Sequence, residues 1–107
     1  MKIYVAGPMT GYKDFNFPQF ATVAAALRKL GYEVINPAEL NAGIDGDWQA
    51  CMRRDIAALI TCDGVALLPG WVSSKGAMIE TNLARGLGLH VASWTAWAMF
   101  DHCKAAA

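Results

Sequence analysis

Short apolar runs alternate along the chain with longer stretches in which apolar and polar residues are mixed. Four apolar runs have the composition of β-strands, and they lie at residues 2–6, 32–36, 64–68 and 90–94. Three mixed stretches repeat apolar side chains every three or four residues, which predicts helices over residues 17–30, 47–61 and 75–87. Strands that alternate with helices predict an α/β fold with a parallel, doubly wound sheet.

Residues with strong conformational preferences mark the ends of these elements. Pro18 suits the first turn of the first helix, Gly31 suits its end, and Asp47 suits the N-cap of the second helix. Pro37 ends the second strand, and the polar residues that follow, 41–47, are predicted to form a loop. The tail, residues 95–107, is predicted to form one short helix.

Size, hydrophobicity and charge narrow the functional class. With 107 residues, we expect a single domain over residues 1–107. Hydrophobic residues make up 55% of the chain, yet no apolar run approaches the roughly 18 to 20 residues of a membrane span. We therefore expect no membrane partner, and we assign the apolar surplus to the interface of a homo-oligomer, a dimer or larger. The net charge is zero and the basic residues are scattered, which favours a small-molecule partner over nucleic acid.

The remaining composition argues against a leader peptide, disulfides and metals. Residues 1–7 form a predicted strand without the apolar region and cleavage site of a signal peptide, so we expect a cytoplasmic protein. Cys51, Cys62 and Cys103 are an odd number without a C-x-x-C pair, which argues against disulfides and a zinc site. His90 and His102 lack a partner at metal-ligand or triad spacing. We expect no metal and no cofactor.

The most distinctive segment is residues 67–80, where an apolar strand ends, a loop rich in glycine and serine follows, and a helix begins. Glu80 lies in the opening turns of that helix. Such loops gather at the carboxyl ends of parallel strands, where ligands bind. The positive end of the helix suits a phosphate or ribose hydroxyls, and we expect it to keep Glu80 ionised and usable as a nucleophile.

Other residues of this loop have structural and functional interpretations side by side. Ser73 and Ser74 are either N-caps of the helix or ligand contacts. Lys75 is either a solvated loop residue or a contact for an anion. Trp71 belongs to no periodic stripe, which makes it a candidate for stacking on a base.

Two carboxylates fall on apolar faces of predicted helices, where each is costly unless it is paired, hydrogen-bonded or protonated. Asp55 shares a stripe with Trp48, Met52, Leu59 and Cys62, and Glu80 lies among Ala77, Leu83, Ala84 and Leu87. The structural alternative for Asp55 is a helix cap or an ion pair with Arg53, Arg54 or Arg85.

Both helices flank the third predicted strand, so both carboxylates approach the crevice at its carboxyl end. A carboxylate pair is the minimal equipment for breaking a glycosidic bond: in the retaining reaction one carboxylate is the covalent nucleophile and the other group handles the proton. The pair therefore favours a catalytic site.

Four segments in this order resemble the nucleoside 2-deoxyribosyltransferase superfamily, and more closely its DUF4406 branch of small proteins frequent in phages and prophages. They are residues 3–9, 52–56, 62–63 and 73–80. The resemblance covers about residues 1–94. It implies a Rossmann-like (flavodoxin-like) doubly wound parallel sheet of about four to five strands with flanking helices.

The resemblance also implies roles for individual residues. Glu80 matches the nucleophile that attacks C1′, and Tyr4 matches the tyrosine that orients it by a hydrogen bond. Asp55 matches the aspartate that positions the sugar or assists proton transfer to the leaving base. The expected substrate-binding residues are Gly7, Pro8, Met9, Trp71, Ser73, Ser74 and Gly76.

The chain departs from the transferases at two places. They carry an aspartate six residues before the nucleophile, where this chain has Ser74, and a hydroxyl accommodates a 5′-phosphate that a carboxylate repels. Their subunits complete each other's sites with a C-terminal segment that residues 95–107 do not match.

We therefore expect cleavage or 2-deoxyribosyl transfer at the N-glycosidic bond of a nucleoside or nucleotide, with a lean to a 5′-monophosphate. One alternative is a non-catalytic nucleotide-binding protein of phage origin that acts as a sensor or sequesters its ligand. The other alternative is an oligomeric structural protein.

Overall fold

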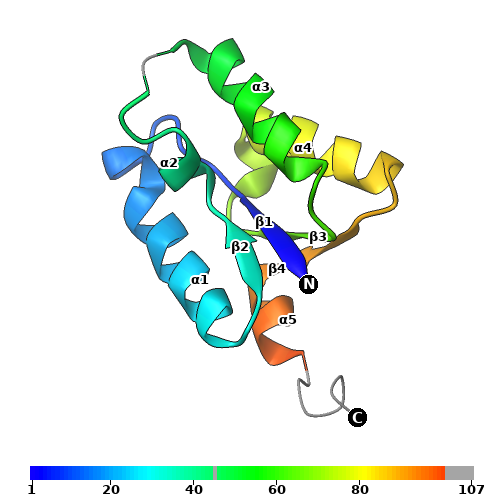
Figure 1. Ribbon diagram of the computed structural model, residues 1–107. Coiled ribbons are helices and arrows are strands. Elements are labelled where there is room, and N and C mark those ends of the chain that lie inside the picture. Colours follow the sequence, from blue (N-terminus) through cyan, green and yellow to red (C-terminus); the bar gives the residue numbers. More distant parts are fainter. Residues whose placement is uncertain (45, 101–107) are drawn as a thin grey trace.

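The computed structural model describes residues 1–44 and 46–100 (Figure 1). Within these ranges the chain forms one sheet of four parallel strands in the order β2-β1-β3-β4. The strands are β1 (Lys2–Ala6), β2 (Glu33–Ile35), β3 (Gly64–Leu67) and β4 (His90–Ser93). The helices are α1 (Phe17–Lys29), α2 (Pro37–Leu40), α3 (Trp48–Leu59), α4 (Lys75–Gly86) and α5 (Trp94–Met99), with 3-10 turns η1 (Lys13–Asn16) and η2 (Trp71–Ser73). The predicted α/β fold with a doubly wound parallel sheet is confirmed.

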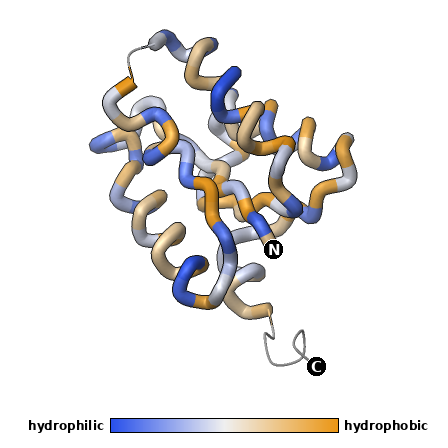
Figure 2. The backbone as a smooth tube through the Cα atoms, viewed as in Figure 1, coloured by the Kyte–Doolittle hydropathy of each residue, from blue (hydrophilic) through white to orange (hydrophobic). Residues whose placement is uncertain are grey.

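Helices cover both faces of the sheet because side chains along each strand alternate between the faces. Ile3 and Val5 of β1 pack with residues of α1 and α5, whereas Tyr4 and Ala6 pack with residues of α3 and α4. Figure 2 shows hydrophobic and hydrophilic residues alternating around α3 and α4, as expected for helices with one buried face. Tyr4 therefore faces the helices that carry the two candidate carboxylates.

The connections place a crevice between β1 and β3. The chain leaves β1 toward β2 on one side and leaves β3 toward β4 on the other, so the loops after β1 and β3 part from each other. The two strands end level, with Ala6 opposite Leu67. The first residues of both loops consequently meet at one edge of the sheet.

Three short elements and one boundary were not anticipated. Helix α2 follows β2 because the Asn36 side chain accepts a hydrogen bond from the Ala38 N–H and Pro37 occupies the first turn. Turns η1 and η2 lie in segments predicted as loops. Helix α5 confirms the predicted C-terminal helix for part of its length, and it starts at Trp94 because Ser93 caps it. The expectations for residues 101–107, including His102 and Cys103, lie outside the described residues.

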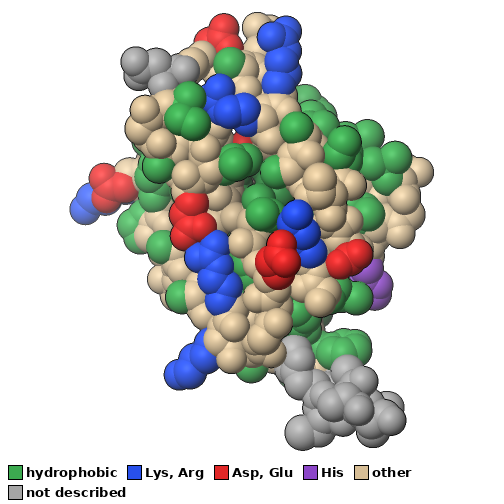
Figure 3. All heavy atoms as spheres, in the orientation of Figure 1, with side chains coloured by type: hydrophobic (Ala, Val, Ile, Leu, Met, Phe, Trp, Pro, Cys, Tyr) green, Lys and Arg blue, Asp and Glu red, His purple; other side chains and the backbone are tan. Residues whose placement is uncertain are grey.

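The surface agrees with the even charge of the sequence. Figure 3 shows acidic and basic side chains interspersed on the visible face, with apolar side chains between them. In the part of the chain that the structure describes, no helix is both long enough and apolar enough to cross a membrane.

Close packing of α5 on β3 explains why residue 64 is a glycine. The Trp97 side chain is buried and its Nε1–H donates to the Val65 carbonyl at 2.8 Å. A Cβ atom at Gly64 would lie 2.5 Å from the Trp97 ring and 2.8 Å from the His90 carbonyl oxygen. No side chain fits there without moving α5 or β4.

We expect Gly64→Ala to lower the free energy of unfolding by about 1–3 kcal/mol, the usual effect of overpacking a core. Urea unfolding followed by circular dichroism measures it. The control is Gly86→Ala at the end of α4, where an added Cβ meets no atom within 4 Å; it should raise stability by up to about 1 kcal/mol. Equal effects of the two variants would contradict the packing argument.

Candidate active site

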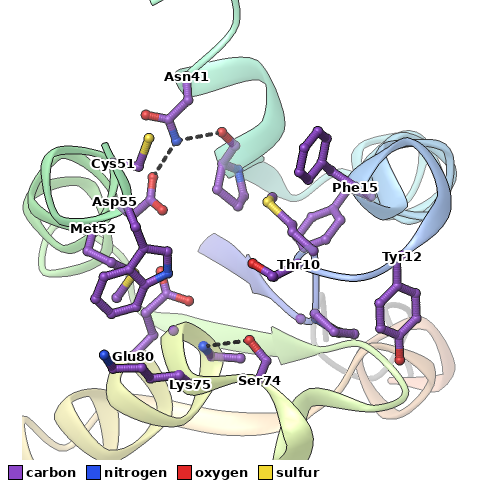
Figure 4. Close-up of a pocket in the computed structure, with 18 of the residues that line it drawn as sticks. Thr10, Tyr12, Phe15, Asn41, Cys51, Met52, Asp55, Ser74, Lys75 and Glu80 are labelled. Atoms are coloured by element: carbon purple, nitrogen blue, oxygen red, sulfur yellow. Dashed lines mark hydrogen bonds between the residues drawn. The ribbon is translucent and has the colours of Figure 1, made fainter. Parts of the chain in front are cut away.

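A cavity of about 930 Å³ opens at the carboxyl ends of β1, β2 and β3 (Figure 4). Its walls come from the loop after β1, from the start of α1, from the first residue of α2 and the residue after α2, and from the N-terminal parts of α3 and α4. Nine of the ten candidate residues line it: Tyr4, Gly7, Pro8, Met9, Asp55, Ser73, Ser74, Gly76 and Glu80.

Glu80 is the most deeply buried acidic group of the site. Its side chain is 5% exposed, and the hydroxyl of the fully buried Tyr4 donates a hydrogen bond to Glu80 Oε2 at 2.5 Å. The pKa of Glu80 is raised to about 8: burial is the main cause, the Tyr4 hydrogen bond opposes the increase, and the Asp55 charge adds to it. Burial also raises the pKa of Tyr4 well above its usual value, so Tyr4 remains a donor.

The expectation that the helix start keeps Glu80 ionised is wrong. Glu80 lies in the second turn of α4, and the field of a helix end falls off within the first turn. The first turn is also occupied, because Ser74 Oγ accepts from the Ala77 N–H at 3.2 Å. A pKa of about 8 keeps Glu80 mainly in its protonated form at neutral pH.

Asp55 projects into the same cavity from α3 and is 7% exposed. Asn41 Nδ2 donates to Asp55 Oδ1 at 2.7 Å, and Arg54 Nε donates to Asn41 Oδ1 at 2.8 Å. Burial raises the pKa of Asp55, and the Asn41 hydrogen bond and the Arg54 charge both oppose the increase. The ion pairs of the described residues are Lys2–Glu33 and Arg28–Glu39, so Asp55 is satisfied by an amide and not by the predicted arginine pair.

The loop after β1 forms the opposite wall. Gly7 is required there because a Cβ would lie 2.6 Å from Leu68 Cβ, where β1 and β3 end side by side. Asn16 Nδ2 donates to the Pro8 carbonyl at 3.0 Å and closes the loop. Asp14, Phe15 and Asn16 all have left-handed backbone angles, with φ of 53°, 52° and 62°. Phe15 lines the cavity in this constrained conformation.

The start of α4 contributes polar groups. Ser74 has the predicted N-cap role, and its hydroxyl proton remains available to a ligand because the cap uses the oxygen as acceptor. Lys75 is the one cationic side chain among the described residues that line the cavity. Its Nζ lies 4.5 Å from the centroid of the Trp48 ring at the start of α3.

Trp71 is the one candidate that the structure does not bring to the cavity. Gly70, with φ of 85°, begins turn η2, and Trp71 packs against the buried cluster under α3 and α4. The Arg85 guanidinium lies 5.6 Å from its ring centroid. Trp71 belongs to no helical stripe because it lies in the short turn η2, where its side chain packs against the core and does not line the cavity.

Several lining residues escaped the sequence analysis as candidates. Asn41 lies in the polar segment predicted only as a loop, Phe15 lies in the first crossover loop, and Phe17 is the first residue of α1. Trp48 and Met52 were assigned to the buried stripe of α3, yet they also line the cavity. Their position in the sequence could have identified them as candidates, because each follows or faces the carboxyl end of a predicted strand. Among the described residues, no group of three or more His, Cys, Asp or Glu could hold a metal ion.

Two solved structures share this fold. One is the 2-deoxyribosyltransferase of the psychrotolerant bacterium Bacillus psychrosaccharolyticus, at 16% identity and a TM-score of 0.73, with 97% of this chain and 95% of that chain covered. The other is the 2-deoxyribosyltransferase of Leishmania mexicana, at 19% identity and a TM-score of 0.67, with 86% of this chain and 62% of that chain covered. No curated protein matches the chain.

The structure is therefore an α/β domain with the fold of 2-deoxyribosyltransferases and a buried carboxylate pair in its crevice. The family described as "Domain of unknown function (DUF4406)" matches residues 1–93, and the chain belongs to this family. The resemblance seen in the sequence motifs is thus confirmed.

The raised pKa of Glu80 predicts how stability depends on pH. The folded protein holds this proton up to about pH 8, whereas the unfolded chain releases it near 4.5. The stability from the bound proton is complete below pH 4.5 and is lost as the pH rises to about 8. Glu80→Gln has no such proton to lose. The free energy of unfolding of Glu80→Gln minus that of wild type should therefore increase by up to about 1.4 kcal/mol per pH unit in this window.

Urea unfolding of both proteins from pH 5 to 9 measures the difference. The control is Glu39→Gln, because the Arg28 hydrogen bond lowers the pKa of Glu39 and moves its titration below this window. Its difference from wild type should be constant from pH 5 to 9. Parallel curves for Glu80→Gln and wild type would show that Glu80 is ionised throughout.

Proposed function

We propose that the protein cleaves the N-glycosidic bond of a nucleoside or nucleotide, or transfers its 2-deoxyribosyl group, through Glu80 as the nucleophile. The observation that carries the proposal is the pair Glu80 and Asp55, buried in one cavity, with Glu80 oriented by Tyr4. The shared fold with two 2-deoxyribosyltransferases supports the same class of substrate.

The first step forms a covalent intermediate. An oxygen of the Glu80 carboxylate bonds to C1′ of the sugar while the bond between C1′ and the base nitrogen breaks. The bonding electron pair leaves with the base, and a proton from Asp55 neutralises it. The products are a glycosyl ester of Glu80 and a free base.

The second step releases the sugar. A second base, or water, bonds to C1′ through its lone pair, and Glu80 leaves as a carboxylate. The proton of the incoming group returns to Asp55, which restores the site. Transfer and hydrolysis thus differ only in which molecule reaches C1′ after the first base has left.

The reaction needs Glu80 ionised and Asp55 protonated. When the two acids hold one proton between them, this is the less populated of the two states. The proton resides mainly on Glu80, whose pKa is about 8. The two acids interact, so they titrate as a pair, and the reactive arrangement keeps a constant small share between the two pKa values. Activity should therefore be highest between those values.

A nucleoside 5′-monophosphate suits the entrance of the cavity. The Ser74 hydroxyl has a proton to donate, and Lys75 is the one cation of the described lining residues. Both lie at the start of α4, whose partial positive charge also favours an anion. The exposed aromatic side chains that line the cavity are available to a base, and Trp71 is not among them: they are Tyr12, Phe15, Phe17 and Trp48.

A second candidate function is nucleotide binding without turnover. The protonation of Glu80 at neutral pH favours it, because a neutral carboxyl group binds a sugar hydroxyl well but attacks C1′ poorly. Assembly into a homo-oligomer stays a prediction for either function.

Wild type should release free base from at least one member of a panel of ribo- and deoxyribonucleosides and their 5′-monophosphates, and Glu80→Ala should reduce release by at least about 10³-fold. Chromatography detects the base, with and without a second base as acceptor. The fold control is the unchanged circular dichroism spectrum of Glu80→Ala. Equal release by both proteins would remove Glu80 as nucleophile, and binding by wild type without release would favour the second candidate.

The pH profile of kcat/KM tests the role of Asp55. For wild type we expect a maximum below pH 8 and a fall above it, because the shared proton is then lost. For Asp55→Asn we expect a lower rate that rises with pH to a plateau, with its midpoint below about pH 8 because the Asp55 charge no longer raises the pKa of Glu80. A plateau above pH 8 in wild type would exclude Asp55 as the proton donor.

A further inference from the structure

Asn41 is the residue through which the rest of the protein holds Asp55. It lies at the C-cap of α2 and lines the cavity. Its Nδ2 group donates to Asp55 Oδ1 at 2.7 Å and to the Pro37 carbonyl at 3.0 Å (Figure 4). These two bonds use both protons of the amide and tie α3 to the first residue of α2.

Arg54 determines which way the Asn41 amide faces. Its Nε–H donates to Asn41 Oδ1 at 2.8 Å, so the oxygen of the amide is turned toward Arg54 and the nitrogen toward Asp55. The opposite orientation would set the amide oxygen against the Asp55 carboxylate and the NH₂ group against a guanidinium donor. The chain Arg54, Asn41, Asp55 is therefore fixed in direction.

We propose that Asn41 is a positioning residue that holds Asp55 Oδ1 away from the reaction and leaves Oδ2 as the oxygen that carries the proton into the cavity. The described residues provide no hydrogen-bond partner for Oδ2, and Thr81 Oγ1, not Oδ2, is the buried polar atom without a partner among them. Oδ2 thus keeps contact with the cavity. This inference rests on the proposed function for its kinetic part only.

The groups that surround Asp55 oppose one another. Glu80 from α4 and Tyr4 from β1 line the same cavity, and the Asp55 charge raises the pKa of both groups. Arg54 from α3 and Asn41 favour the Asp55 carboxylate. Asn41 is the neutral member of this set, so replacing it removes a hydrogen bond without changing the charge of the site.

The test combines Asn41→Leu, which has similar size and no donor, with Arg54→Lys, which keeps the charge but lacks the Nε donor. The pKa of Asp55 is measured by carbon-detected NMR of the carboxyl group in protein labelled at aspartate. We expect it to rise by about one pH unit in Asn41→Leu, since a hydrogen bond to a charged group is lost. We expect a smaller rise in Arg54→Lys, because the amide is no longer held in one orientation.

Kinetics supply the second measurement. We expect Asn41→Leu to lower kcat by roughly tenfold or more with little change in KM, because the substrate still binds while the proton is misdirected. The control is Arg53→Lys, which changes the exposed arginine next to Arg54 and should leave both the pKa and kcat unaltered.

The outcomes separate the possible roles. A lower melting temperature with an unchanged Asp55 pKa would show that Asn41 only connects α2 and α3 structurally, which would overturn the proposal. A higher KM with unchanged kcat and pKa would make Asn41 a substrate contact, which also overturns it. If Asn41→Leu does not fold, Arg54→Lys decides by the same criteria.

The NMR measurement needs no turnover. A raised Asp55 pKa in a protein that releases no base would support the hydrogen-bond arrangement while the proposed function fails. An unchanged pKa in an active enzyme would reject the positioning role alone.

Discussion

The burial of Glu80 is the constraint on which the rest of the site depends. A carboxylic acid with almost no solvent contact is tolerated only if it is neutral or if its surroundings donate hydrogen bonds to it. Tyr4 provides one such bond from the central strand β1, and the proton held up to about pH 8 provides the neutrality. A second acid, Asp55, faces the same cavity and makes the ionised state of Glu80 still less favourable. The fold thus favours the neutral form of the Glu80 carboxyl group at neutral pH.

The topology explains why this group can be buried and accessible at once. Glu80 lies on the sheet-facing side of α4, close to the level where β1 and β3 end. Deeper in the protein the same face of α4 carries only small buried residues such as Ala84. The sheet edge therefore turns a buried helical position into the floor of a cavity, while Gly7 allows β1 and β3 to end in close contact.

The order of elements and the two carboxylates were predictable from the sequence because they depend on local periodicity. Asp55 and Glu80 stand out as charged residues in apolar stripes, and Ser74 precedes its helix in the usual N-cap position. The protonation of Glu80 was mispredicted because burial, a property of the assembled fold, outweighs the local field of the helix. The surroundings of Trp71 and Asn41 were not predictable for a related reason: Trp71 follows a glycine with a positive φ and does not line the cavity, and Asn41 is hydrogen-bonded to residues 13 and 14 positions along the chain.

The left-handed run from Asp14 to Asn16 has a consequence for the order of folding. Such angles cost L-amino acids about 1–2 kcal/mol per residue, so this segment does not adopt them on its own. They become affordable once α1 has docked through Phe20 and Asn16 has bonded to the Pro8 carbonyl. The carboxylate floor of the cavity comes from the sheet and α3 and α4, whereas its aromatic wall exists only after α1 is in place. We therefore expect this wall to form after the sheet and to be the first part of the cavity lost when α1 loosens.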